Sequence, residues 1–137
     1  MKILICVLCL TLAVTGLIYA DHAYIEIATV HDIMEVVQKP NMDAVVAIVK
    51  AGGPQSDRDW KKVKKYASVL AESTQLILMG SRVKDEIWIK GANEVIAASQ
   101  ETITAANAKD ANAFKAASGN ISRGCRTCHT VHKPKKK

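Results

Sequence analysis

Apolar residues recur at intervals of three and four along most of the chain, and this spacing is what most constrains its fold. Such intervals place side chains on one face of an α-helix, so each stripe predicts an amphipathic helix that is buried against another element. Aromatic residues make up only 4% of the chain, and no run alternates long enough for a strand. The sequence therefore predicts an all-α protein, and its 137 residues fit a single domain.

Turn residues divide the stripes into segments. The first stripe, Ile27, Val30, Met34 and Val37, continues past Pro40, which should kink or break it, and ends at Gly52-Gly53-Pro54. The second segment begins near Asp57 and stops by Gly80, and its inward residues are expected to be Trp60, Val63, Ala67, Leu70, Thr74 and Ile77.

Two further segments complete the chain. The third covers about residues 85–107, with an inward stripe of Ile87, Val95, Ile96 and Ile103. The fourth opens at Asp110, which suits an N-cap, and runs through Phe114, Ala117, Ile121, Cys125 and Cys128. Four helices with short connections predict an antiparallel up-down-up-down four-helix bundle.

The first twenty residues are typical of an export signal. Lys2 precedes an uncharged apolar stretch from Ile3 to Ala20, and the charged chain starts at Asp21. Cleavage after Ala20 would leave residues 21–137 as the working domain. Retention would make the stretch a membrane anchor, because roughly 18 apolar residues are just enough to span a bilayer. Both alternatives predict an exported, periplasmic domain. In both, Cys6 and Cys9 belong to the apolar stretch and not to that domain.

The net charge of +6, from 19 basic and 13 acidic residues, does not indicate a nucleic-acid binder, because acidic residues are interspersed along the chain. The one cluster of like charge is the C-terminal tail, formed by Lys133, Lys135, Lys136 and Lys137. This tail is either a solvated end or a docking patch for an acidic partner.

One motif carries chemistry: Cys125-Arg126-Thr127-Cys128-His129. Residues three and four apart share a helix face, so Cys125 and Cys128 can form thioethers with the two vinyl groups of one haem. His129, one turn after Cys125, can bind the iron. The motif therefore predicts one covalently attached haem c.

Other interpretations of this motif are a thiol-redox pair, half of a zinc site, and a plain disulfide. A thiol-redox pair favours a βαβ context, which a helical chain lacks. Structural zinc needs four ligands, and the candidates that remain are His132 and the distant His22 and His31. Export, helical context and the adjacent histidine together favour haem.

The chain resembles the cytochrome c prime family, the class II c-type cytochromes, over about residues 22–132. The phrase Ala47–Gly53 is similar to the Val-Lys-Gly close of the family's first helix, and Glu86-Ile87-Trp88 is similar to the opening of its third. There are departures. His132 and Lys133 stand where the family has an aromatic residue and Arg, and Val30 stands where many members carry an Arg, although His31 could take that role.

The resemblance implies two alternatives for the sixth iron position. Low-spin members place a methionine there, which corresponds to Met34, and act as electron carriers. Other members leave the position open and bind nitric oxide or carbon monoxide, and some relatives form homodimers. From spacing alone Met34 could be core filler, placed about 18 Å into its helix. Its competitors are Met42, Met79, His31 and His22. The expected function is electron transfer through a haem held by Cys125, Cys128, His129 and Met34, with no enzymatic activity.

Overall fold

The computed structural model describes residues 24–133, and all of the regular structure in that range is helical. This confirms the all-α prediction. The predicted export signal (1–20), His22 and the last three tail lysines lie outside the described residues. In chain order the elements are α2 (Val30–Asp32), the π-helix η1 (Ile33–Gln38), α3 (Lys39–Lys50), α4 (Asp57–Leu76), the 3₁₀ helix η2 (Gly80–Arg82), α5 (Glu86–Ala108) and α6 (Ala111–His132).

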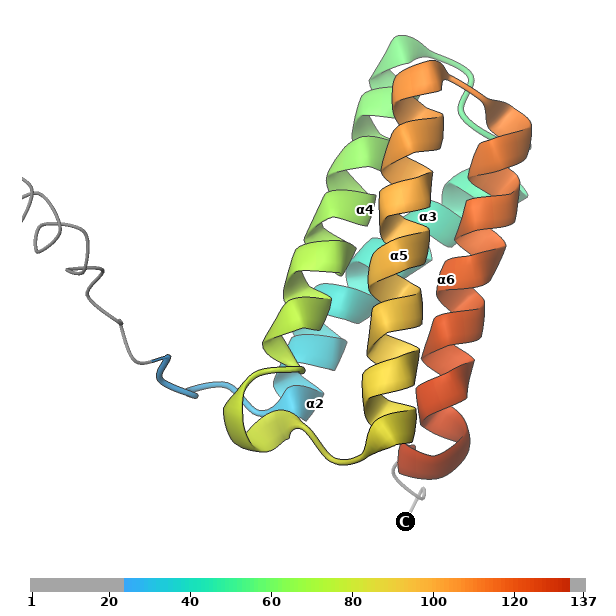
Figure 1. Cartoon of the computed structure of the whole chain (residues 1–137). Helices are drawn as coiled ribbons and strands as arrows, with labels where there is room; N and C mark the ends of the chain where they lie inside the picture. The colour runs from blue at the N-terminus through green and yellow to red at the C-terminus, as the bar shows by residue number, and fades with distance from the viewer. Residues whose placement is uncertain (1–23, 134–137) are drawn as a thin grey trace, which may run out of the picture.

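The three long helices α4, α5 and α6 stand side by side, and α3 lies behind them (Figure 1). Contacts join α3 with α4, α4 with α5, and α5 with α6, whereas α3 meets α6 at few points. The start of α2, the turn between α4 and α5, and the end of α6 lie together at one end of the molecule (Figure 1). No helix within residues 24–133 is long and apolar enough to cross a bilayer.

Side-chain caps set the helix starts close to their predicted positions. The side chains of Ser56, Asp85 and Asp110 each accept hydrogen bonds from backbone N–H groups in the first turns of α4, α5 and α6. The first segment ends where predicted, because Gly52 and Gly53 take φ values of 90° and 98°, which non-glycine residues rarely adopt.

Pro40 does not break the first segment, which stays helical from Val30 to Lys50. The distortion lies just before the proline, where η1 replaces the α-helical pattern and the Lys39 N–H donates to the Met34 carbonyl. A π-turn is wider than an α-turn, so it relieves the clash between the proline ring and the preceding turn. The stripe also begins later than predicted, since Ile27 precedes the helix and is 90% exposed.

The prediction for the third stripe was partly wrong. Ile87 is exposed, and Ile96 and Ile103 are only half-buried, whereas Val95 is buried. The inward face of α5 consists mostly of small residues: Gly91, Ala92, Ala98, Ser99, Thr102, Ala105 and Ala106, together with Trp88. In contrast, every predicted inward residue of α4 is buried.

Two glycines allow α5 and α6 to approach closely. A Cβ placed on Gly124 would lie 2.8 Å from the Val95 backbone nitrogen, and one on Gly91 would lie 2.9 Å from the Cβ of Cys128. Real side chains do not tolerate such distances, so each glycine is needed where the helices cross. The motif Cys125–His129 follows directly after Gly124 and is held against α5 by this contact.

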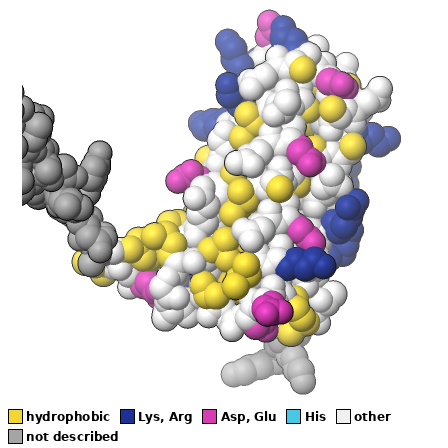
Figure 2. Space-filling view, viewed as in Figure 1, with side chains coloured by type: hydrophobic (Ala, Val, Ile, Leu, Met, Phe, Trp, Pro, Cys, Tyr) yellow, Lys and Arg dark blue, Asp and Glu magenta, His cyan; other side chains and the backbone are white. Residues whose placement is uncertain are grey.

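The surface is uneven in its distribution of apolar side chains. Figure 2 shows hydrophobic side chains gathered towards the end that carries the α4–α5 turn and the segment leading into α2. Exposed apolar residues of that end include Tyr24, Ile25, Ile27, Val83, Ile87 and Val131. Single exposed apolar residues are ordinary, but a group at one end of a small protein is typical of a contact surface.

We predict that Gly124→Ala lowers the free energy of unfolding by about 1–3 kcal/mol, because the added methyl overlaps the α5 backbone. Gly119 on the same helix is the matched control, since a Cβ there would meet nothing within 4 Å. Gly119→Ala should leave stability unchanged or raise it by up to ~1 kcal/mol through helix propensity. Urea denaturation of the three proteins tests this, and equal stability of both variants would contradict it.

Candidate functional site

The sequence motif lies in the last two turns of α6. Cys128 is buried with 6% of its surface exposed, Cys125 is half-buried, and His129 is exposed. Neither thiol forms a disulfide within the described chain. The residues therefore present two sulfurs towards the interior and an imidazole beside them, as the helical spacing predicted.

Two cavities open beside this motif. Cavity I, of about 510 Å³, lies between the first helical segment and α6 and is lined by His31, Met34, Glu35, Gln38, Lys39, Met42, Asp43, Leu70, Val95, Cys125, His129 and Lys133. Cavity II, of about 40 Å³, reaches deeper towards α4 and α5, where Thr74, Ile77, Gly91, Ala92, Gly124 and Cys128 line it. Five residues line both cavities: Met34, Gln38, Val95, Cys125 and His129.

The structure brings Met34 to the motif and separates its competitors. Met34 and His129 line both cavities, whereas Met42 and His31 line cavity I alone. Met79 lies between α4 and η2 and lines neither cavity. The predicted depth of Met34 was wrong, because its helix begins at Val30; Met34 is about 6 Å along the helix, at the same end as His129.

Met34 is half-buried against a second, smaller core cluster at this end of the molecule. The buried members of this cluster are Ile33, Ile77, Trp88, Ala92 and Cys128. The π-turn that precedes Pro40 includes Met34, and π-turns inside α-helices occur frequently at functional sites. The thioether therefore belongs to a packed wall and lies on the same cavities as the motif histidine.

Burial shifts the pKa values of the two thiols and of the imidazole in the motif. Desolvation raises the pKa of both the Cys125 and the Cys128 thiols above that of an ordinary cysteine. Reactive thiol-redox cysteines need a lowered pKa, so this environment does not favour that alternative. Partial burial, and then the Lys133 ammonium, lower the pKa of His129. That shift favours neutral imidazole, which is the form that binds metal.

Four of the polar residues that line cavity I form two pairs. His31 lies 3.2 Å from Glu35, and Lys39 lies 2.5 Å from Asp43, each between side-chain nitrogen and carboxylate oxygen. Among residues 24–133, no three His, Cys, Asp or Glu side chains converge as a metal-binding group. A haem iron takes four ligands from the porphyrin, so it does not require such a group.

His132 was considered above as a possible zinc ligand and as a departure from the family, and the structure shows it in a different contact. Its Nε2 lies 3.0 Å from an Asp85 carboxylate oxygen, and its ring meets the edge of Trp88 with centroids 5.5 Å apart. Asp85 also caps α5 by accepting from the Trp88 N–H at 2.8 Å. The capping bond and the His132 contact lower the pKa of Asp85. This contact fixes the end of α6 one turn beyond His129.

A second pair that sequence analysis missed joins the first segment to α4. Gln38 Nε2 donates to Thr74 Oγ1 at 3.2 Å, and Thr74 Oγ1 donates to the Leu70 carbonyl at 2.6 Å. The residues are separated by 36 positions, so no local pattern could reveal the pair. One sequence feature could have pointed to Gln38: it follows Met34 by one helical turn and therefore lies on the same helix face.

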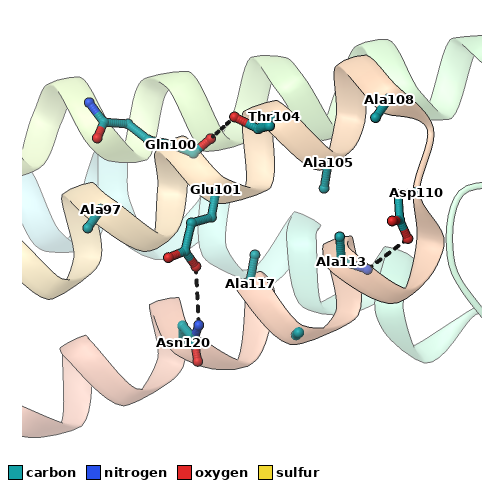
Figure 3. A pocket seen from close by; sticks show the side chains of 11 residues that line it. Ala97, Gln100, Glu101, Thr104, Ala105, Ala108, Asp110, Ala113, Ala117 and Asn120 are labelled. Carbon is teal, nitrogen blue, oxygen red and sulfur yellow. Dashed lines mark hydrogen bonds between the residues drawn. The ribbon is translucent and has the colours of Figure 1, made fainter.

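A further hollow, of about 700 Å³, lies elsewhere, between α5 and α6. Figure 3 shows its walls of alanine methyl groups and the bond from Asn120 to Glu101, which measures 3.2 Å. It includes no cysteine, histidine or methionine. This alanine groove is therefore separate from the site that the motif defines.

Comparison with known proteins gives no match: no family model, no curated protein and no solved structure is similar enough to the chain to be counted a relative.

Proposed function

We propose that this protein is a c-type cytochrome that carries one haem c, attached covalently through Cys125 and Cys128. The observation that carries the proposal is the convergence of His129, Met34 and Cys125 on the same two cavities. The donor set suits the cofactor, because two thiols, an imidazole and a thioether are the groups that hold haem in cytochromes c. The size of cavity I falls within the range of ~300–1,000 Å³ that is usual for ligand sites.

Each residue has a distinct role in this proposal. His129 is the proximal ligand, and Met34 is the sixth ligand on the opposite wall. Bound haem would supply a one-electron couple, and a His/Met ligand pair raises its reduction potential. The apolar side chains of Leu70, Val95 and Ile77 exclude water from the cavity walls. We therefore propose an exported, periplasmic electron carrier without enzymatic activity, similar to the low-spin branch of the cytochrome c prime family.

We also propose that the helices form an antiparallel up-down-up-down bundle. Short connections and the contacts of α3 with α4, α4 with α5 and α5 with α6 support it. The sparse contact between α3 and α6 leaves space for the haem between them, where cavity I lies.

The second candidate is a five-coordinate haem protein that binds nitric oxide or carbon monoxide. It is favoured by one observation, which is that cavity II offers about 40 Å³ beside Met34 and His129. A cavity needs roughly 10–15 Å³ of such space to hold one water molecule, so cavity II can hold a ligand of diatomic size.

Covalent attachment is tested by acid-acetone extraction of the purified protein. We predict that haem stays on the denatured polypeptide, because thioether bonds survive unfolding. Replacement of both Cys125 and Cys128 by alanine should release the haem. Replacement of either cysteine alone should leave the haem attached by one thioether bond. Complete loss of haem from the wild type would contradict the proposal.

Sixth ligation by Met34 is tested by optical spectra and carbon monoxide binding. The wild type should be low-spin in both oxidation states, with the weak long-wavelength band of a sulfur–ferric iron bond, and should bind carbon monoxide slowly or not at all. Met34→Ala should convert the iron towards high spin and admit carbon monoxide. Met42→Ala and Met79→Ala are the controls and should leave the spectrum unchanged. A wild type that is already high-spin would favour the gas-binding candidate.

We propose that an acidic redox partner docks at the end of the molecule that carries His129. Exposed Val83, Ile87 and Val131 lie in the segments that form this end, and Lys133 lines cavity I. Lys39, which also lines cavity I, is already paired with Asp43, so we propose that Lys133 and the tail that follows it contribute to steering the partner.

Salt dependence tests the role of the tail. The rate of electron transfer should fall as ionic strength rises, because salt screens exposed charges, and it should fall less steeply when residues 134–137 are deleted. Replacement of the exposed Lys61, Lys64 and Lys65 on α4 by alanine is the control, because it removes the same three positive charges as the deletion. An identical salt slope for full-length and truncated protein would contradict the proposal.

A further inference from the structure

Gln38 stands apart from the other residues that line both cavities. Met34, Cys125 and His129 are assigned to the haem under the proposed function, and Val95 is apolar. Gln38 is the remaining member of that set, and its amide can both donate and accept hydrogen bonds. It occupies the last position of η1, one turn after Met34.

The hydrogen bonds around Thr74 fix the orientation of this amide. The single hydroxyl hydrogen of Thr74 is used in its 2.6 Å bond to the Leu70 carbonyl, so Oγ1 can only accept from Gln38. Gln38 must therefore present its NH₂ group to Thr74, at 3.2 Å. Thr74 is 1% exposed, so water does not compete for this anchor.

The anchored amide still has hydrogen-bonding groups that are not engaged. One hydrogen bond occupies a single N–H of Gln38, which leaves its second N–H and both lone pairs of Oε1. Among the described residues, the bond to Thr74 is the one hydrogen bond that the Gln38 side chain makes. Cavity II is lined mostly by apolar side chains such as Val95 and Ile77. Because the Thr74 hydroxyl is already committed, a hydrogen-bond acceptor in cavity II would find its donor mainly in the Gln38 amide.

We propose that Gln38 is the specificity-determining residue of the sixth iron position. When Met34 is not bound to the iron, the Gln38 amide donates a hydrogen bond to the small ligand that takes its place. It thereby favours ligands that accept hydrogen bonds, such as cyanide and related anions, over carbon monoxide, which accepts them poorly. Distal hydrogen-bond donors are one of the levers that decide which ligands a haem retains. This inference rests on the proposed haem function.

The experiment measures ligand selectivity in holoprotein that carries Met34→Ala, where the sixth position is open. Cyanide affinity of the ferric form and carbon monoxide affinity of the ferrous form are compared with and without Gln38→Leu. Cyanide binding should weaken roughly tenfold, as expected for a lost hydrogen bond to a charged acceptor, while carbon monoxide affinity changes less than about twofold. The carbon–oxygen stretching frequency of the ferrous complex should rise as the donor is removed.

Two further variants separate a direct contact from a structural one. Thr74→Val keeps the amide but removes its anchor, so it should produce a smaller loss of cyanide affinity than Gln38→Leu. Gln100 is exposed on α5 and lines the alanine groove, so Gln100→Leu should change the affinity for neither cyanide nor carbon monoxide. A Gln38→Leu effect that is equal for both ligands, or absent for cyanide, would overturn the inference.

Failure of the proposed function is visible separately. If the wild-type protein carries no covalent haem, the proposed function is contradicted before any Gln38 variant is made. If the wild type is high-spin, Met34 is not the sixth ligand. The affinities for cyanide and carbon monoxide are then compared with and without Gln38→Leu in the wild-type background, with the same expected outcome.

Discussion

The site depends on the close contact of α5 and α6, which two glycines make possible. Gly124 precedes the motif directly, and Gly91 faces Cys128 from the opposite helix. Because neither position accepts a Cβ, the helices meet backbone to backbone at the level of the cysteines. This contact fixes the position of α6 and leaves its other side facing the gap towards α3. The placement of the two cysteines and of His129 relative to α5 follows from it. Beyond His129, the Asp85–His132 contact holds the last turn of α6.

The first helical segment forms the facing wall, and its geometry is set by Pro40. A regular α-helix could not pass through a proline without losing a backbone hydrogen bond and clashing with the preceding turn. The chain solves this with a π-turn over Ile33–Gln38, which carries both Met34 and Gln38. One extra residue per turn rotates whatever precedes it by roughly 100° relative to α3. The proline therefore influences which side chains of that segment face the motif.

Sequence periodicity predicted α4 best, because large apolar residues such as Trp60, Val63 and Leu70 recur at helical intervals and all are buried. It failed on α5, where the buried face is made of glycine, alanine, serine and threonine, which hydrophobic patterning does not distinguish from surface residues. The motif was recognised from the spacing of its cysteines and histidine, and the structure confirms that these residues lie on a helix. Gln38 with Thr74, and His132 with Asp85, are 36 and 47 positions apart, so only the tertiary structure reveals them.

The burial of Cys128 has a consequence for the order of events in the life of this chain. With 6% of its surface exposed and Gly91 against its Cβ, the sulfur cannot be reached by an enzyme while α5 and α6 are packed. Under the proposed function, haem attachment at this residue would therefore take place on an open chain, before the two helices meet. Attachment and folding would then be successive steps of one process, and the packed helices would shield the thioether afterwards.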